Sequence, residues 1–158
     1  MIYPFFWEQR KFENIFDYER PDKYIVKSDE YNDYSKTPVL TANKAFILGY
    51  TDESNTYNKE KESILFDDFT LDTKFVDFPY MVKSSALKIL TVKDKKNDNL
   101  RFNYELLSKT KFNMLGHARH YISVVQPEEI RTTNKEEQDK IAKLTTTIDN
   151  LITLHQRK

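Results

Sequence analysis

The feature that most constrains the fold is an apolar stripe in the C-terminal stretch DKIAKLTTTIDNLITLHQRK (139–158). Its members follow one another at spacings of three and four residues, which is typical of a helix with one apolar seam of the coiled-coil kind. The predicted seam consists of Ile141, Leu144, Ile148, Leu151 and His155. The sequence therefore predicts a long helix that packs against another long apolar surface.

The start of this helix is indicated by two overlapping capping-box patterns. Thr133 with Glu136, or Asn134 with Glu137, places a capping side chain three residues before a glutamate. No Gly or Pro follows them. Two partners are open for the seam: the chain's own globular domain, or the matching helix of a second copy. The seam widens at Ile152 and Leu154, which favours contact with more than one neighbour.

The preceding part of the chain has the pattern of an α+β domain with a small mixed sheet. Short β-rich stretches alternate with polar turns, one amphipathic helix is expected at 100–110, and 7–18 suits a short helix or an irregular segment. The strands are expected at 23–26, 38–41, 45–50, 63–66, 74–78, 86–92 and 119–125. We predict one domain over 1–130 and a helical unit over 131–158.

Composition excludes several classes of protein. The chain has no cysteine, which rules out disulfides and thiolate metal sites, and its 2 glycines leave no Gly-rich phosphate loop. No apolar run approaches the ~18 residues of a membrane span. The first residues lack a basic leader and a cleavage site, so we expect no secretory signal, no membrane contact and a cytoplasmic location.

Charge is balanced overall but unevenly distributed. The net charge is zero, yet 81–120 holds nine Lys and Arg against three Asp and Glu. Such clustering can form an electrostatic footprint for phosphates, although lysines also simply solvate a surface.

Four stretches resemble the specificity (S) subunit of type I restriction–modification enzymes. They are WEQRKF (7–12), TPVLTANKAFILGYTDE (37–53), ILFDDFTLDTKFVDFPYMVKSSALKIL (64–90) and EEQDKIAKLTTTIDNLITLHQRK (136–158). The tail is similar to the conserved helix of that family, and the opening W-E-Q-R-K to the start of a target-recognition domain.

The resemblance implies a non-catalytic DNA-recognition subunit that reads half of a bipartite target on double-stranded DNA. It implies two target-recognition domains per full subunit, each followed by a helix that pairs antiparallel with the other. Here one domain and one helix are seen, so we expect a half subunit that forms a homodimer through its C-terminal helix. The implied partners are methyltransferase (modification) subunits and restriction/translocase subunits. S-adenosylmethionine, ATP and magnesium are expected only in those partners, and no cofactor in this chain.

Within this interpretation, polar and cationic side chains near predicted strand ends are candidates for DNA contact. Asn suits the N6/N7 edge of adenine, Lys and Arg suit guanine or phosphate, and Thr offers a hydroxyl or a methyl group. The candidates are Thr41, Asn43, Lys44, Thr70, Lys74, Lys83 and Arg119. Arg119 is the strongest arginine candidate, because Gly116 permits a close backbone approach before it. Alternatively, Asn43 is only a turn residue, and Lys74 and Lys83 only solvated surface.

Two pairs suggest metal binding without supporting it, so no metal site is expected. Asp67 and Asp68 lack a third ligand and are better explained by turn chemistry or structural hydrogen bonds. His117 and His120 would point to opposite faces of a strand at 119–125. An enzyme such as a nuclease is disfavoured by the lack of an acid cluster. An interaction or regulatory module that binds the methyltransferase subunit without reading DNA is the remaining alternative.

Overall fold

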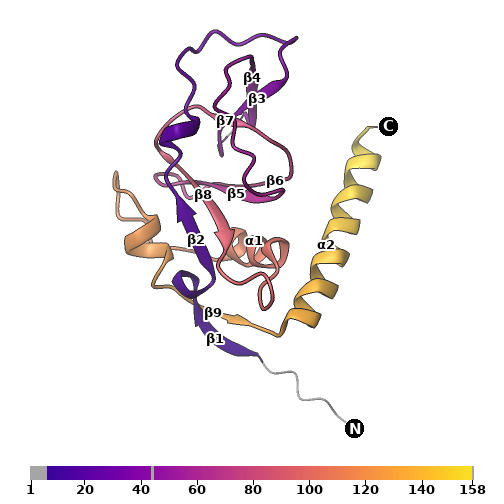
Figure 1. The fold of residues 1–158 in the computed structure, drawn as a ribbon. Helices are drawn as coiled ribbons and strands as arrows, with labels where there is room; N and C mark the ends of the chain where they lie inside the picture. The colour runs from indigo at the N-terminus through magenta and orange to yellow at the C-terminus, as the bar shows by residue number, and fades with distance from the viewer. Residues whose placement is uncertain (1–6, 44, 158) are drawn as a thin grey trace.

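The structure is a computed structural model that describes residues 7–43 and 45–157. Its elements, in chain order, are β1 (Glu8–Lys11), η1 (Phe12–Asn14), β2 (Phe16–Glu19), η2 (Asp22–Tyr24), β3 (Thr37–Leu40), β4 (Ile47–Thr51), β5 (Ser63–Asp67), β6 (Thr73–Val76), β7 (Met81–Val82), β8 (Leu87–Val92), α1 (Leu100–Lys109), η3 (Tyr121–Val125), β9 (Glu129–Thr132) and α2 (Lys135–Gln156). The predicted α+β class, with a long C-terminal helix, is confirmed (Figure 1).

An antiparallel four-stranded sheet in the order β2-β8-β5-β6 forms the centre of the domain. All five residues of β5 are buried. Their run SILFD shows no polar alternation because this strand lies between two neighbours and is covered on both faces.

The two faces of this sheet carry separate apolar clusters, because successive side chains of a strand point to opposite faces. On one face, Ile64, Phe66 and Leu90 pack with Leu107 of α1 and with Tyr121 of η3. The other cluster joins the sheet to the three-stranded sheet β4-β3-β7, in which β3 pairs parallel with β7 and antiparallel with β4. It includes Leu65, Leu87 and Ile89 together with Leu40 and Val82. The central sheet is thus the middle layer of the domain.

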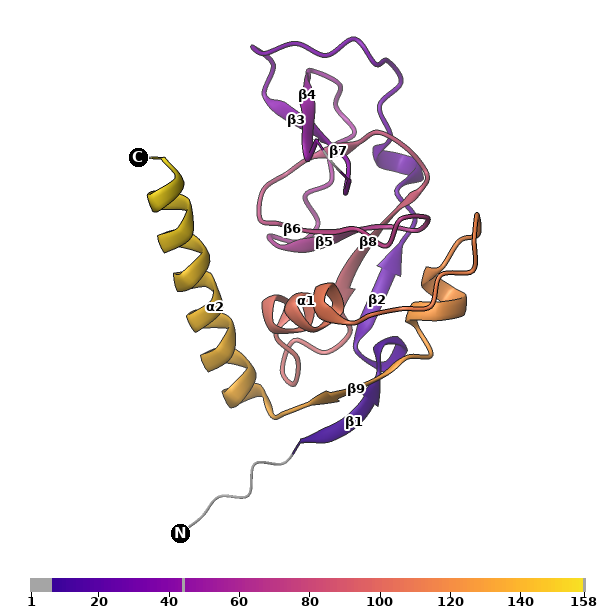
Figure 2. The same cartoon turned by 180° about the vertical axis from the view of Figure 1, so that it is seen from behind.

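The long helix α2 leaves the domain through a two-stranded ribbon of β1 and β9 (Figure 1). Asn134 caps it by accepting a hydrogen bond from the Glu137 N–H at 3.0 Å, so the second capping alternative is the one that forms. In both Figures 1 and 2, α2 runs along one side of the domain, and the segment leading to η3 lies on the other side. The predicted domain boundary at 130 falls inside β9 (Glu129–Thr132). The division of the chain into a domain over 1–130 and a helical unit over 131–158 stays a prediction.

The apolar stripe of α2 is exposed. Leu144, Ile148 and Leu151 are each between 46% and 60% exposed, as are the flanking Ile152 and Leu154, and His155 is exposed too. Ile141 is half-buried, and the only buried residues of the helix, among those described, are Gln138 and Ala142. The stripe therefore does not pack on the described part of its own domain.

The strand expected at 119–125 is wrong, because Tyr121–Val125 forms a π-helical turn. The Val125 N–H bonds the His120 carbonyl and the Gln126 N–H bonds the Tyr121 carbonyl, each five residues back. Tyr121 and Val125 point into the core while Ile122 and Ser123 are exposed. A five-residue apolar stretch does not distinguish a strand from a helical turn by periodicity alone.

Two further expectations need correction. The segment 23–26 is not a strand: Asp22–Tyr24 forms a 3-10 turn, and Ile25 makes only an isolated bridge with Val82. The segment 7–18 is mostly extended, with η1 as a single turn between β1 and β2. None of the helices in 7–43 and 45–157 is long and apolar enough to cross a membrane.

Candidate nucleic-acid interface

The turn after β5 is organised by two aspartates with different tasks. Asp67 Oδ1 accepts hydrogen bonds from the Phe69 and Thr70 N–H groups at 2.9 and 3.0 Å, which is an Asx turn. Leu71, at φ 65°, lies in the left-handed region and completes the reversal towards β6. Asp68, the residue directly after Asp67, is buried in the domain rather than exposed to solvent.

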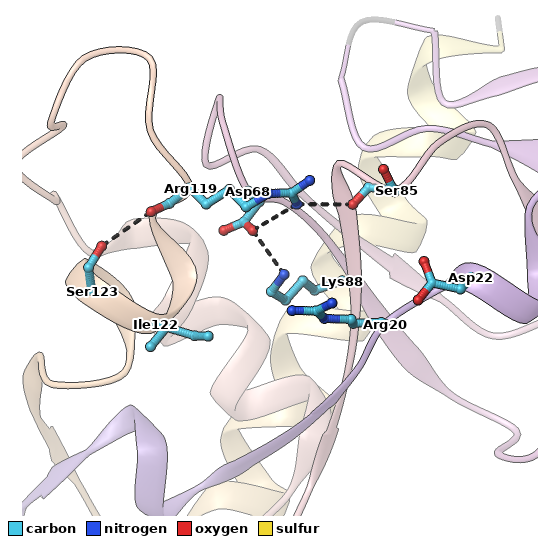
Figure 3. A pocket seen from close by; sticks show the side chains of 8 residues that line it. All are labelled: Arg20, Asp22, Asp68, Ser85, Lys88, Arg119, Ile122 and Ser123. Carbon is cyan, nitrogen blue, oxygen red and sulfur yellow. Dashed lines mark hydrogen bonds and ion pairs between the residues drawn. The ribbon is translucent and has the colours of Figure 1, made fainter.

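The buried Asp68 carboxylate joins three parts of the chain (Figure 3). Its Oδ1 accepts from the N–H groups of His120 and Tyr121 at 3.0 and 2.8 Å. Its Oδ2 contacts Lys88 Nζ on β8 at 2.9 Å and Arg119 Nη1 at 3.4 Å. The Asp68 carboxylate thus connects the turn after β5, strand β8 and the segment that leads into η3.

The pKa of the Asp68 carboxyl lies below its ordinary value of 3.8. Burial acts to raise it, but hydrogen bonds from Lys88 and the Tyr121 N–H, the Lys88 charge and Arg119 together outweigh burial. The residue is therefore held as a carboxylate, and the buried Lys88 ammonium is its counter-charge.

The ring of His120 fixes the loop that precedes Arg119. Its Nε2 accepts from the Leu115 N–H at 3.0 Å, so Nδ1 carries the proton and donates to the Asp68 carbonyl oxygen at 3.0 Å. The strand at 119–125 that would have pointed His117 and His120 to opposite faces does not form. In the structure, both His120 nitrogens are occupied by the chain itself, and His117 is exposed.

Arg119 lies at the edge of a concave pocket of about 220 Å³. Its guanidinium contacts the Ser85 carbonyl oxygen through Nη1 at 3.1 Å and lies over the Phe69 ring, 5.1 Å from the centroid. The pocket is lined by Arg20, Asp22, Asp68, Ser85, Lys88, Arg119, Ile122 and Ser123 (Figure 3). All of these residues except Ile122 are polar or charged, and the pocket lies on the side of the domain away from α2.

Residues 5–158 match a protein family described as "Type I restriction modification DNA specificity domain". The chain belongs to this family. It is 44% identical over 113 residues to the EcoR124I/EcoR124II specificity subunit of Escherichia coli, a match that covers 69% of this chain and 28% of that protein. The family consists of non-catalytic specificity subunits, so the chain is a specificity domain and not an enzyme.

Solved structures of the same kind share the fold. The S subunit of a type I restriction–modification system from M. genitalium superposes with a TM-score of 0.70 at 18% identity, covering 93% of this chain and 40% of that one. The HsdS subunit from Thermoanaerobacter tengcongensis gives a TM-score of 0.56 at 16% identity, covering 99% and 41%. The specificity domain thus spans less than half the length of these relatives.

The predicted DNA-contact residues fall into three places in the specificity domain. Thr41 and Asn43 lie in the turn between β3 and β4, where Thr41 Oγ1 donates to Asn43 Oδ1 at 3.3 Å; Lys44 lies outside the described residues. Lys83 is adjacent to that turn, because its N–H bonds the Leu40 carbonyl oxygen at 3.1 Å. These residues share one end of the β3–β7 pair.

Thr70 and Arg119 form the second place, joined through Phe69 and Asp68. Thr70 is exposed and donates its hydroxyl to Asp72 at 2.8 Å. Lys74 stands alone on β6, opposite Leu65 of β5 and so at the edge of the central sheet. No comparison tests any of these residues, so their DNA contacts stay predictions.

Two cationic residues of the pocket were missed from the sequence. Arg20 follows β2 and carried no motif. Lys88 did carry a signal, since it interrupts the buried apolar run ALKILTV, and a lysine buried in a strand needs a paired carboxylate. The carboxylate that pairs with it, Asp68, comes from the neighbouring strand end and was not identifiable without the sheet register.

Proposed function

We propose that this chain recognises DNA, reading one half of a bipartite target for a type I restriction–modification enzyme. The observation that supports this most is the match of residues 5–158 to the DNA specificity family. The excess of cations in 81–120, and the pocket that gathers three of the chain's cations, suit a surface that meets phosphates.

The exposed stripe of α2 supports the second part of the proposal, a two-fold homodimer. Contiguous exposed leucine and isoleucine side chains on one helix face usually mark an interface. A second copy offers the same seam in the matching helix, so the two helices bury each other's apolar side chains. The paired helices then hold two identical domains at a fixed separation.

The methyltransferase and restriction subunits remain expected partners, with S-adenosylmethionine, ATP and magnesium confined to them. A cytoplasmic location accords with this assembly and stays a prediction.

The test is to express the chain with its modification subunit in a host lacking other methylation and to sequence the methylated genomic sites. We expect one defined motif. If the two proteins co-purify but no site is methylated and the purified chain binds no duplex, the chain is an interaction module and the proposal is wrong. Cleavage of DNA by the purified chain with a divalent metal would instead indicate an enzyme.

A further inference from the structure

The pocket beside Asp68 has a charge pattern that the specificity function does not by itself explain. Lys88 and Asp68 are both buried, with side chains 5% and 1% exposed, and their contact cancels both charges. Of the charged residues that remain in the lining, Arg20 and Arg119 are positive and Asp22 is negative. The described lining therefore carries one positive charge in excess, which suits a singly charged anion.

Arg119 is held in place rather than free to extend. Its contacts with the Ser85 carbonyl and with Asp68 both use Nη1, which leaves Nη2 and Nε without a hydrogen-bond partner among the described residues. The aromatic face of Phe69 supports the guanidinium from one side. With its side chain 51% exposed, Arg119 presents two fixed, unused donor groups to whatever enters the pocket.

The shape of the pocket distinguishes between two kinds of DNA contact. Base edges lie on the floor of a groove, so reading them requires a side chain that projects from the protein. Phosphates project from the duplex, so they fit a concavity. The volume of about 220 Å³ is several times the roughly 30 Å³ that a water molecule takes in the liquid. A phosphate group with its waters therefore has room.

We propose that the pocket formed by Arg20, Lys88 and Arg119 binds a phosphate of the DNA backbone and contributes affinity without sequence information. Arg119 and Arg20 contact the anion, whereas Lys88 and Asp68 position Arg119 and the segment that carries it. This rests on the proposed DNA recognition, and it changes the expected role of Arg119 from a base contact to a contact that sets register.

The experiment measures binding of the full chain to two short duplexes over a range of salt concentrations. One duplex carries the motif identified by sequencing the methylated genomic sites, and the other has the same base composition in scrambled order. We expect Arg119→Ala and Arg20→Ala each to weaken binding to both duplexes by the same factor. Each should also make the fall of log affinity with log salt less steep, and the two substitutions together should reduce this slope by about 0.9, the value for the one phosphate that the pocket holds.

Two further variants keep the result interpretable. Arg119→Lys retains the charge, so its salt slope should return to the wild-type value. Lys140→Ala removes an exposed cation of α2 that pairs with Glu136 and lies outside 81–120, and should leave affinity and slope unchanged. Thermal unfolding of each variant checks that the fold is intact.

Each outcome decides between the two proposals. A loss of affinity confined to the motif duplex would show that Arg119 reads a base. Unchanged salt slopes in both alanine variants would overturn the phosphate site. The proposed DNA recognition is compatible with either result. Equal wild-type affinity for both duplexes would leave the phosphate site standing while sequence reading fails. Absence of any duplex binding would overturn both.

Discussion

At the scale of single residues, Asp68 decides how the candidate interface is built. Its carboxylate receives two backbone N–H groups and a buried lysine, so it is a structural centre as well as a support for Arg119. Removing one partner of a buried ion pair strongly lowers the free energy of unfolding, because the other partner stays buried and charged without a counter-charge.

Asp68→Asn tests this directly. The amide oxygen can still accept from the backbone, but the amide N–H₂ then faces the Lys88 ammonium, donor against donor. We expect the free energy of unfolding to fall by roughly 3–5 kcal/mol, the range for breaking a buried pair, measured by urea denaturation at neutral pH. Asp72→Asn, a change at an exposed turn carboxylate, is the matched control and should have little effect.

The wild-type protein and Asp68→Asn should differ in how their free energies of unfolding change with acid. Because the folded-state pKa of Asp68 lies below 3.8, its contribution to stability is complete above that pH and is lost as pH falls through the folded pKa. The gap between wild type and Asp68→Asn should therefore narrow only below pH 3.8. A gap that stays constant throughout acidification would contradict the role of the charge.

At the scale of elements, one buried glutamine sets how α2 is attached. Gln138 Oε1 accepts from the Asn99 N–H at 2.8 Å, and its Nε2 donates to the Thr133 carbonyl at 2.7 Å. Farther along, Asp149 of α2 pairs with Arg101 of α1. The helix is thus joined to the start of α1 at two points, while its apolar stripe remains open.

Gln138→Leu replaces the side chain by a shorter, apolar one and removes its hydrogen bonds. We expect a loss of about 1–3 kcal/mol for each buried polar group left unpaired, and faster amide hydrogen exchange in the first turns of α2. Lys140→Leu, two residues along on the exposed surface, is the control. Unchanged stability and exchange in Gln138→Leu would mean that the glutamine does not fix the helix.

The stripe predicts association. Wild-type chain at micromolar concentration should sediment as a dimer, and Leu144→Glu combined with Leu151→Glu should sediment as a monomer, because a dimer would bury unpaired carboxylates in the seam. Thr146→Glu combined with Thr153→Glu adds the same charge at two exposed positions outside the seam and should leave the dimer intact. A wild-type monomer with a fully helical α2 would rule out the pairing.

At the scale of the whole molecule, the proposed pairing surface and the proposed DNA-contact pocket lie on different sides of the domain. The segment carrying Arg119 and η3 lies away from α2 in both views (Figures 1 and 2), so a paired helix does not cover the pocket. A two-fold dimer presents two identical recognition surfaces. The methylated motif should therefore be a split palindrome, and an asymmetric bipartite motif from this chain alone would contradict the two-fold arrangement.

The sequence by itself determined the elements whose signal is local. The heptad spacing and the capping patterns at 133–137 predict α2, and the β-rich stretch 63–66 predicts a strand, because these signals depend on neighbours in the chain. The family was recognisable from the same stretches.

Only the tertiary structure decided the pocket. Asp68 and Lys88 meet because β5 and β8 pair in one register, and Arg119 joins them because the segment before η3 turns back onto Asp68. The residues in contact are separated by 20 to more than 50 positions in the sequence. Hydrophobic periodicity within one element therefore does not predict these contacts. The π-helical turn at Tyr121–Val125 belongs here too, since two N–H groups bound to a distant carboxylate replace the strand pairing that the sequence predicted.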